Sequence, residues 1–333
     1  MNNERYFLTL LAGCLVGMLA VIGINRQIDI FGLYRNHTCE GIGLHGEERY
    51  SKYLHMHRYV PECFDGIWMG ASLSANLDPS RIRGFRIYNA SLMGARIGQL
   101  EQLYSTAVDQ GADFEVAIIS IHPYLTGETE KTDTHLAKKG LQSAMGSVSL
   151  LRVYALALIR KFKLWESKYP QNQYSSEGRN DYNRFFEVPD IVSHIQKKIH
   201  DPELTRLASH EEGLHSLQSL LEQINQTEAR ILLYFHPIPA DIYRANREIL
   251  DSYWTKITEM PLRHPDKVLL ININQHPSAF NKDLSNYIDH GHLSELGQER
   301  LLSLMNQELE KTGHFKNYPS EKEPGHYKKP LNP

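Results

Sequence analysis

Apolar and polar positions along this chain form short runs that fit strands and longer segments that fit helices. The short runs cover residues 66–69, 85–89, 114–121, 230–235 and 268–273. Three of the short runs, 114–121, 230–235 and 268–273, are nearly continuous in apolar residues, which is typical of strands buried on both faces. Apolar residues at helical spacing fill residues 97–111, 242–257 and 294–309. Strands that alternate with helices over short connections predict a parallel sheet with helices on both sides, and therefore an α/β domain over residues 65–311.

One long segment, residues 124–228, departs from this alternation. It contains an apolar helical stretch at 149–163, a polar loop at 169–182 and further helical patterns at 191–224. Basic residues interrupt the apolar stretch, which favours a packed helix over a second membrane span. We expect a helical insertion that forms a lid or a wall of the substrate site. Residues 312–333, which contain prolines and lysines, are predicted to be a disordered tail.

The N terminus carries an uncharged apolar run from Tyr6 to Ile24 that is long enough to cross a bilayer as a helix. Residues 1–25 are therefore predicted to be an uncleaved membrane anchor, since no clean cleavage site follows the run. Leu11-Ala-Gly-Cys14 resembles a bacterial lipoprotein cleavage box, but apolar sequence continues beyond Cys14, which argues against that alternative. The basic residues that flank the run on its two sides do not decide its orientation.

Residues 26–64 form a polar connector whose cluster of Tyr and His side chains is expected to pack against the domain. Cys39 and Cys63 both fall in this connector. They would form a disulfide in an oxidising compartment, whereas two separate buried thiols are the alternative for a cytosolic domain.

Composition excludes one class of function. The chain of 333 residues has a formal net charge of -3, which provides no field that would attract nucleic acid. Hydrophobic residues make up 41% of the chain, enough for the core of an ordinary globular protein. Its 17 histidines are many for this length.

The first candidate for chemistry follows the first predicted strand, in the stretch GIWMGASLSAN at 66–76. Sites in parallel sheets form outside the carboxyl ends of the strands, and Ser72 lies at such a corner. A hydroxyl there is exposed beside backbone N–H groups, as nucleophilic catalysis requires. The stretch lacks the G-x-S-x-G elbow of the common hydrolases, and small residues at such turns usually serve the turn, so this stretch taken alone favours a turn serine without catalytic function.

A second candidate lies immediately before the last predicted helix, in Tyr287-Ile-Asp-His-Gly-His-Leu-Ser294. A serine nucleophile needs an imidazole to take its proton and a carboxylate to orient that imidazole. Asp289 and His292 are close enough in sequence for one to orient the other. The same loop is also explained without chemistry if Ser294 caps the helix.

Taken in order, three blocks resemble the SGNH/GDSL hydrolase superfamily: Gly70-Ala-Ser72, Asn89-Ala-Ser-Leu-Met-Gly94 and Asp289-His-Gly-His292. The resemblance implies an SGNH-like, flavodoxin-like three-layer domain in which Ser72 is the nucleophile. Gly94 would contribute its N–H to the oxyanion hole, and Asp289 with His292 would match the family's D-x-x-H pair. The anchor and the insertion resemble membrane-tethered bacterial relatives that work in O-acetylation or D-alanylation of cell-surface polymers.

The third block of the family, a Gly-x-Asn after the 114–121 strand, is replaced here by Ser120-Ile-His122-Pro123. Because an asparagine donor to the oxyanion is missing, the side chain of Asn89 or His122 is expected to supply that bond. His236 ends the 230–235 strand and is expected to line the substrate pocket at the same rim.

The resemblance implies a membrane-anchored serine esterase or O-acyltransferase with its domain on the extracytoplasmic, periplasmic side. Its substrate would be the acyl esters of a polysaccharide or cell-wall polymer, and a membrane-bound acyltransferase is a candidate partner that supplies the acyl group. The alternative is a non-catalytic polysaccharide-binding or scaffold subunit that kept the fold, which the missing asparagine favours. A cytosolic domain would exclude both the disulfide and the polymer.

No cofactor or metal is expected. The pairs His290/His292 and His55/His57 are weaker alternatives as zinc ligands, because the sequence fixes no third ligand. His290 is expected to face solvent.

Overall fold

The computed structural model describes residues 3–34, 39, 42, 47–127, 141, 144, 147–162, 164, 175–180, 186–199, 202–208, 210–275 and 279–311. Within them a five-stranded sheet of order β2-β1-β3-β4-β5 forms the centre of the domain, and all of its pairs are parallel. The strands are β1 (Gly66–Met69), β2 (Ile87–Asn89), β3 (Val116–Ile121), β4 (Arg230–Phe235) and β5 (Val268–Asn272). Each predicted strand segment therefore forms a strand, which confirms the α/β class.

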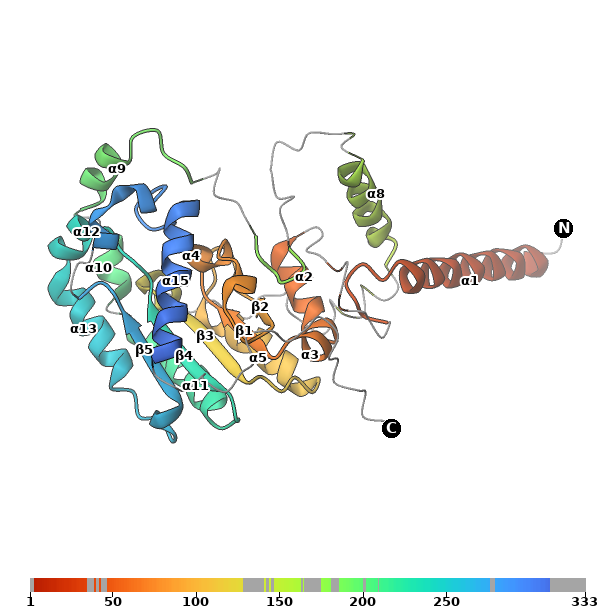
Figure 1. The fold of residues 1–333 in the computed structure, drawn as a ribbon. Helices are drawn as coiled ribbons and strands as arrows, with labels where there is room; N and C mark the ends of the chain where they lie inside the picture. Colours follow the sequence, from red (N-terminus) through yellow and green to blue (C-terminus); the bar gives the residue numbers. More distant parts are fainter. Residues whose placement is uncertain are drawn as a thin grey trace.

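Both faces of the sheet are covered by helices, because side chains of successive strand residues point to opposite faces. On one face Ile67 and Ile119 pack in a core with α5, α11 and α13, and on the other Trp68 and Ile118 pack with α15. In Figure 1 the blue helix α15 crosses in front of the sheet. The bounds are α5 (Ile97–Asp109), α11 (Glu211–Asn225), α13 (Arg247–Thr258) and α15 (Glu295–Lys311).

The predicted insertion divides into parts with different positions. Its helices are α6 (Pro123–Thr126), α8 (Ser149–Lys161), α9 (Ile191–Lys198), α10 (Pro202–Ala208) and α11. The last of these, α11, buries Leu217 and Leu221 beside the sheet and is the crossover helix from β3 to β4. The predicted polar loop is described only at 175–180, where Glu177 accepts a 2.7 Å hydrogen bond from the Asn89 N–H at the edge of β2. The predicted tail, 312–333, lies outside the described residues.

Shorter elements lie mainly in the loops. They are α4 (Ser72–Ala75), η1 (Pro79–Arg81), α12 (Ala240–Ala245), η4 (Pro265–Lys267), α14 (Ala279–Lys282) and η5 (Leu284–Asn286). The predicted helix at 242–257 is divided at Asn246 into α12 and α13. Asn246 donates from its side chain to the carbonyl oxygens of Ile242 and Ile199 at 2.9 Å, and so ties this break to the end of α9.

The connector folds onto the domain as predicted, through α2 (Glu48–His55) and α3 (Tyr59–Cys63). Tyr53, His55 and Tyr59 are buried in the core cluster of the first sheet face or against it. The His55 Nδ1 atom lies 2.8 Å from the hydroxyl of Tyr88 in β2. The connector is thus part of the packed structure and holds the β2 edge of the sheet.

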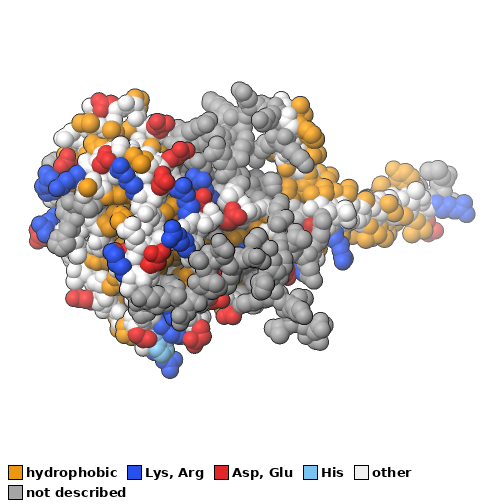
Figure 2. Space-filling view, viewed as in Figure 1, with side chains coloured by type: hydrophobic (Ala, Val, Ile, Leu, Met, Phe, Trp, Pro, Cys, Tyr) orange, Lys and Arg blue, Asp and Glu red, His pale blue; other side chains and the backbone are white. Residues whose placement is uncertain are grey.

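The N-terminal helix α1 (Asn3–Ile28) projects away from the domain (Figure 1). It is long and apolar enough to cross a membrane, and its large apolar side chains are exposed along its length. Figure 2 shows them as an orange rod that leaves the mixed surface of the domain. A bilayer would remove these side chains from water, which agrees with the predicted anchor.

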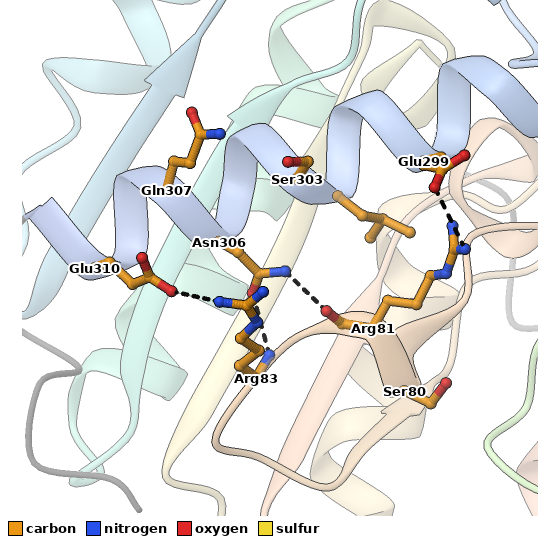
Figure 3. A pocket seen from close by; sticks show the side chains of 9 residues that line it. Ser80, Arg81, Arg83, Glu299, Ser303, Asn306, Gln307 and Glu310 are labelled. Carbon is orange, nitrogen blue, oxygen red and sulfur yellow. Dashed lines mark hydrogen bonds and ion pairs between the residues drawn. The ribbon is translucent and has the colours of Figure 1, made fainter. Parts of the chain in front are cut away.

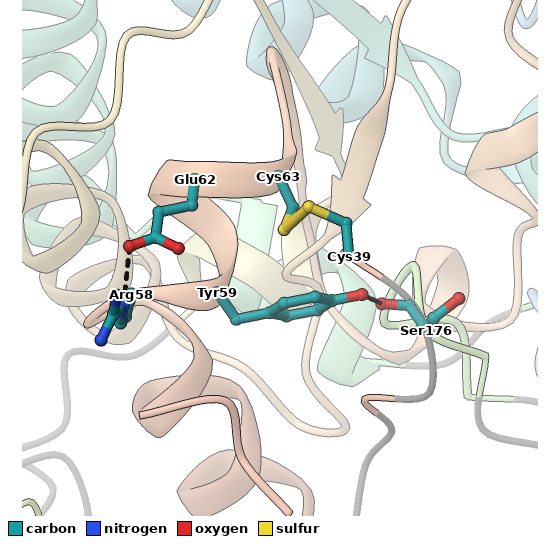
Figure 4. The surroundings of a disulfide bond; sticks show 6 residues. All are labelled: Cys39, Arg58, Tyr59, Glu62, Cys63 and Ser176. Atoms are coloured by element: carbon teal, nitrogen blue, oxygen red, sulfur yellow. Dashed lines mark hydrogen bonds and ion pairs between the residues drawn. A yellow bond between two sulfur atoms is a disulfide. The ribbon is translucent and has the colours of Figure 1, made fainter. Parts of the chain in front are cut away.

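Cys39 and Cys63 form a disulfide (Figure 4), which confirms the pairing considered from the sequence. Both residues are buried. Near the bond, the Tyr59 hydroxyl donates to the carbonyl oxygen of Ser176 at 3.1 Å. The disulfide links the start of the connector to its end at α3, and the hydrogen bond joins α3 to the segment 175–180.

We predict that replacing both cysteines, in Cys39→Ser/Cys63→Ser, lowers the free energy of unfolding by about 3 kcal/mol, because the bridge restricts the unfolded chain across a separation of 24 residues. Urea denaturation of the full chain in detergent measures this change. Cys14→Ser, in the exposed α1, is the matched control and should leave the midpoint unchanged. Equal midpoints for the double variant and the wild type would contradict the prediction.

Candidate active site

The carboxyl ends of β1 to β4 meet at one edge of the sheet because the strands are parallel. Ser72 begins α4 just beyond β1, and its side chain is half-buried. Backbone hydrogen bonds hold the loop after β2 along the loop after β1, from Ala90 N to Trp68 O at 2.7 Å and from Leu92 N to Gly70 O at 3.1 Å. The strand pairing therefore continues into the loops that carry the first two sequence blocks.

Gly70 makes the corner before Ser72 possible. A Cβ atom at this position would lie 2.1 Å from Ser74 Oγ and 2.7 Å from Ser120 Cβ, so a larger residue would displace α4 or β3. The Ser74 hydroxyl is buried, and it donates to the carbonyl oxygen of Ala71 at 3.2 Å. The small residues of this stretch thus serve the close packing of the turn that presents Ser72.

The carboxylate of Asp289 organises the loop before α15. One oxygen accepts hydrogen bonds from the backbone N–H groups of Gly291 and His292, at 2.7 and 2.6 Å. The other oxygen lies 2.7 Å from His292 Nδ1. Both side chains are buried, and the bond fixes the proton of a neutral His292 on Nδ1, because only Nδ1–H can donate to the carboxylate. This is the pair that the sequence predicted.

The same loop lies against the Ser72 turn. A Cβ atom at Gly291 would lie 3.0 Å from Leu73 Cδ2, which places the loop beside the residue that follows Ser72. The Gly291 carbonyl oxygen lies 3.0 Å from His236 Nε2, so the residue that follows β4 is hydrogen-bonded to this loop. The fold therefore brings Ser72, the Asp289–His292 loop and His236 to one edge, although they are far apart in sequence.

Asp289 is ionised in this setting. Burial on its own raises the pKa of its carboxyl group, but the hydrogen bond and the charge of His292, with the Gly291 N–H, outweigh burial and lower that pKa. A buried carboxylate with several donors is stabilised in its charged form. Asp289 can therefore orient His292 and stabilise it when it carries a proton.

Asn89 and Gly94, the two residues predicted from the second sequence block, have different surroundings in the structure. The Asn89 amide nitrogen donates to the carbonyl oxygens of Ser74 and Leu77 at 2.9 and 3.0 Å, so this fully buried side chain fastens the Ser72 turn to β2. Gly94 is exposed and has a positive φ of 62°, a conformation that favours glycine. Asn89 therefore holds the Ser72 turn in place, whereas Gly94 is exposed on the surface of the protein.

Helix α2 holds the loop that ends at Gly94. Arg49 donates to the Met93 carbonyl oxygen at 2.8 Å, and Glu48 accepts from the Met93 N–H at 3.1 Å. Lys52 is fully buried, donates to the carbonyl oxygen of Ser91 and pairs with Glu48 at 3.3 Å. Burial lowers the pKa of Lys52, and Glu48 opposes that shift. No sequence pattern indicated this support, because it depends on how the connector folds back.

His122 and His236 face each other at the ends of β3 and β4, with ring centroids 6.4 Å apart. His122 Nδ1 accepts the Tyr124 N–H at 3.2 Å, so a neutral His122 carries its proton on Nε2. Burial, followed by the neighbouring histidines, lowers the pKa of His122 well below its ordinary value. Burial lowers the pKa of His236 to about 3. Both rings are therefore neutral near pH 7.

Residues of the insertion contact the Asp289–His292 loop. The Phe186 ring stacks on His292 with centroids 3.9 Å apart. His194, from α9, lies with its Nε2 atom 3.1 Å from His290 Nδ1, and the Tyr124 hydroxyl lies 3.1 Å from His290 Nε2. The expectation that His290 faces solvent is wrong, because this ring is half-buried between Tyr124 and His194. Tyr124 could have been found from its place after a strand, whereas no sequence pattern marked Phe186 or His194.

Beyond the Ser72 site, a metal cluster and a surface groove are the other candidates for a functional site. Within the described part of the chain, no cluster of three or more His, Cys, Asp or Glu residues is arranged to hold a metal ion. A groove of about 610 Å³ lies between η1 and α15 (Figure 3). Its polar lining is engaged within the protein, since Arg83 bonds to Glu310 at 2.9 Å and Asn306 donates to the Arg81 carbonyl oxygen at 2.8 Å. We regard this groove as the seam between η1 and α15.

Comparison with known proteins gives little guidance. No family model matches the sequence, and no curated protein matches it. Among solved structures, the chain is similar to one from Streptococcus pneumonia described as "a putative platelet activating factor", with 13% sequence identity and a TM-score of 0.43. The match covers 80% of this chain and 91% of that chain. Likeness at this level establishes no shared activity, so function has to be argued from the site.

We predict that His236 makes folding stability depend on pH. The unfolded chain protonates this imidazole below a pH of about 6.5, whereas the folded protein keeps it neutral down to a pH of about 3. Stability is therefore lost as the pH falls below 6.5, by about 2 kcal/mol at pH 5 for this group. Urea denaturation at pH 7.5 and pH 5 measures the loss.

The matched variant is His236→Gln, which keeps a side-chain donor for Gly291 but does not titrate. It should lose less stability than the wild type between the two pH values, whatever its stability at pH 7.5. Asp289 does not interfere, because a lowered carboxyl pKa affects stability only below a pH of about 4. Identical losses for variant and wild type would contradict the prediction.

Proposed function

We propose that this protein is a membrane-anchored, SGNH-like serine esterase or O-acyltransferase that acts on acyl esters, acetyl esters above all, of a cell-surface polysaccharide. The observation that carries the proposal is the buried Asp289–His292 pair, at 2.7 Å, on a loop that packs against Leu73, the residue after Ser72. A carboxylate, an oriented imidazole and a serine at a strand end are the components of nucleophilic acyl transfer.

In the proposed reaction, His292 Nε2 takes the proton of Ser72 while Ser72 Oγ attacks the acyl carbonyl carbon. The ester C–O bond breaks, and protonated His292 returns the proton to the departing alcohol. A second hydroxyl then loses its proton to His292 and attacks the acyl-Ser72 ester, the bond from the acyl carbon to Ser72 Oγ breaks, and His292 returns the proton to Ser72 Oγ. Water as this second nucleophile gives an esterase, and a sugar hydroxyl gives an O-acyltransferase. Asp289 stabilises the imidazolium formed in both steps.

For the oxyanion hole we propose the backbone N–H groups of Ser72 and Gly94, with His122 in place of the missing asparagine. Two observations favour His122 over Asn89. The Asn89 amide nitrogen already donates to carbonyl oxygens near α4. A neutral His122 carries its proton on Nε2, since Nδ1 accepts the Tyr124 N–H. A neutral imidazole donor of this kind can stabilise developing negative charge.

We place the domain on the extracytoplasmic side of the membrane, supported by the disulfide, which persists in oxidising compartments. Modification of Cys39 and Cys63 by a thiol reagent in intact cells would contradict this placement. The polymer substrate and a membrane-bound acyltransferase as acyl donor belong to the same proposal and rest on the family resemblance.

A second candidate function is a non-catalytic, polysaccharide-binding scaffold subunit. It is favoured by the replacement of the third-block asparagine by His122. Loss of one oxyanion donor typically lowers turnover by about 10²- to 10³-fold, so a site without a substitute would have little activity.

We predict that a fluorophosphonate probe labels the full chain covalently and that Ser72→Ala abolishes the labelling. Ser80→Ala removes an exposed serine outside the site and should label like the wild type. Release of acetate from an aryl acetate, with and without a sugar acceptor, then distinguishes hydrolysis from transfer by the product formed. Labelling that survives in Ser72→Ala, or no labelling and no turnover in the wild type, would leave only the scaffold function.

We predict that His122→Phe lowers kcat on an aryl acetate by about 10²- to 10³-fold with a smaller change in KM, because an oxyanion donor acts mainly in the transition state. His122→Asn restores a donor and the acceptor for the Tyr124 N–H, and should recover much of the rate. If both variants lose activity equally, or if neither does, His122 is not the donor.

A further inference from the structure

Helix α8 has two apolar faces, and one of them is exposed. Leu150 and Tyr154 are buried in the core cluster that includes part of the connector. The exposed side chains follow at helical spacing and form what we name the α8 stripe. Its members and their exposed fractions are Val148 (65%), Leu151 (37%), Leu158 (55%) and Phe162 (64%). Large apolar side chains that are exposed together on one side of a helix mark an interaction site.

The position of α8 is fixed at the end of the membrane helix. Tyr154 donates from its hydroxyl to Asn25 Oδ1 at 2.9 Å, and Asn25 Nδ2 donates to the carbonyl oxygen of Ser147 at 3.3 Å. Asn25 is fully buried and follows the apolar run Tyr6–Ile24 directly. These bonds hold α8 at the level where α1 would leave the hydrocarbon core.

The direction of α8 fits a position along the membrane surface. In Figure 1, α8 runs across the direction of α1 instead of continuing it, beside the domain-proximal end of α1. With 13 residues it is about 20 Å long, too short to cross a bilayer. In Figure 2 the orange side chains over α8 lie next to those at the base of α1.

We infer that α8 is an interfacial helix whose apolar stripe inserts into the boundary between headgroups and acyl chains of the membrane that α1 spans. The bilayer is the occupant favoured by the structure, because α1 brings it to this side of the domain. The exposed Arg152 beside the stripe suits contact with anionic headgroups. With α1 as the first attachment and α8 as the second, the domain is fixed in its rotation about α1. The inference does not depend on the proposed chemistry.

We predict that an environment-sensitive fluorophore (NBD) on Leu158→Cys senses lipid. The full chain, in a Cys14→Ser background with the disulfide intact, is reconstituted into phosphatidylcholine/phosphatidylglycerol vesicles. Phosphatidylcholine with a doxyl spin label on its acyl chain should quench the fluorescence severalfold. NBD on Ser252→Cys, an exposed residue of α13 at the far side of the domain from α1 in Figure 1, should be quenched little.

Absence of quenching at position 158 would overturn the inference. Water-like emission would then show that the stripe stays in solvent, and a blue-shifted but unquenched emission would show that protein covers it. Adding Leu151→Ser and Phe162→Ser, both at exposed positions, should reduce the quenching at 158 without lowering thermal stability. Quenching that is unchanged in this variant would also contradict a stripe inserted in lipid.

Discussion

The parallel pairing of β1 with β2 and β3 determines where the candidate catalytic groups lie. Gly66 lies opposite Ile87 on one side and opposite Val116 on the other, and both faces of these strands are buried. A shift of one residue would move every side chain of a strand from one core to the other and disrupt the packing of both, so the register is strongly fixed. Because the register is fixed, the loops after β1 and β2 run together, and β3 and β4 deliver their histidines to the same edge.

Burial then determines the charges at this edge. His122 and His236 are kept neutral mainly because charged imidazoles would lose their hydration. Asp289 stays ionised in spite of burial, because backbone N–H groups and His292 donate to it. A buried carboxylate among neutral rings gives His292 a strong preference for one orientation. The same arrangement provides an anion to balance the proton that His292 would accept in acyl transfer.

The membrane helix, the connector and the insertion are joined to the rest of the protein by specific contacts. The connector follows α1 and is closed on itself by the disulfide between Cys39 and Cys63. It contributes α2, whose Glu48 and Arg49 hold the backbone at Met93. At the base of α1, Asn25 binds α8 of the insertion. Other residues of the insertion, Phe186 and His194, contact His292 and His290. The connector and the insertion therefore have contacts that bear on the geometry of the site, and the anchor is bound to the insertion through Asn25.

The sequence by itself determined the strands, the main sheet helices, the apolar N-terminal helix and the Asp289–His292 pair, because each depends on local spacing or on apolar runs. It could not show that α11 covers the sheet, that His290 is half-buried, or that Asn89 supports a turn. Nor did it reveal the contacts of Phe186, His194 and α2. These depend on which surfaces meet after folding, since hydrogen bonds and burial between distant segments leave no periodic pattern along the chain. Only the tertiary structure decided them.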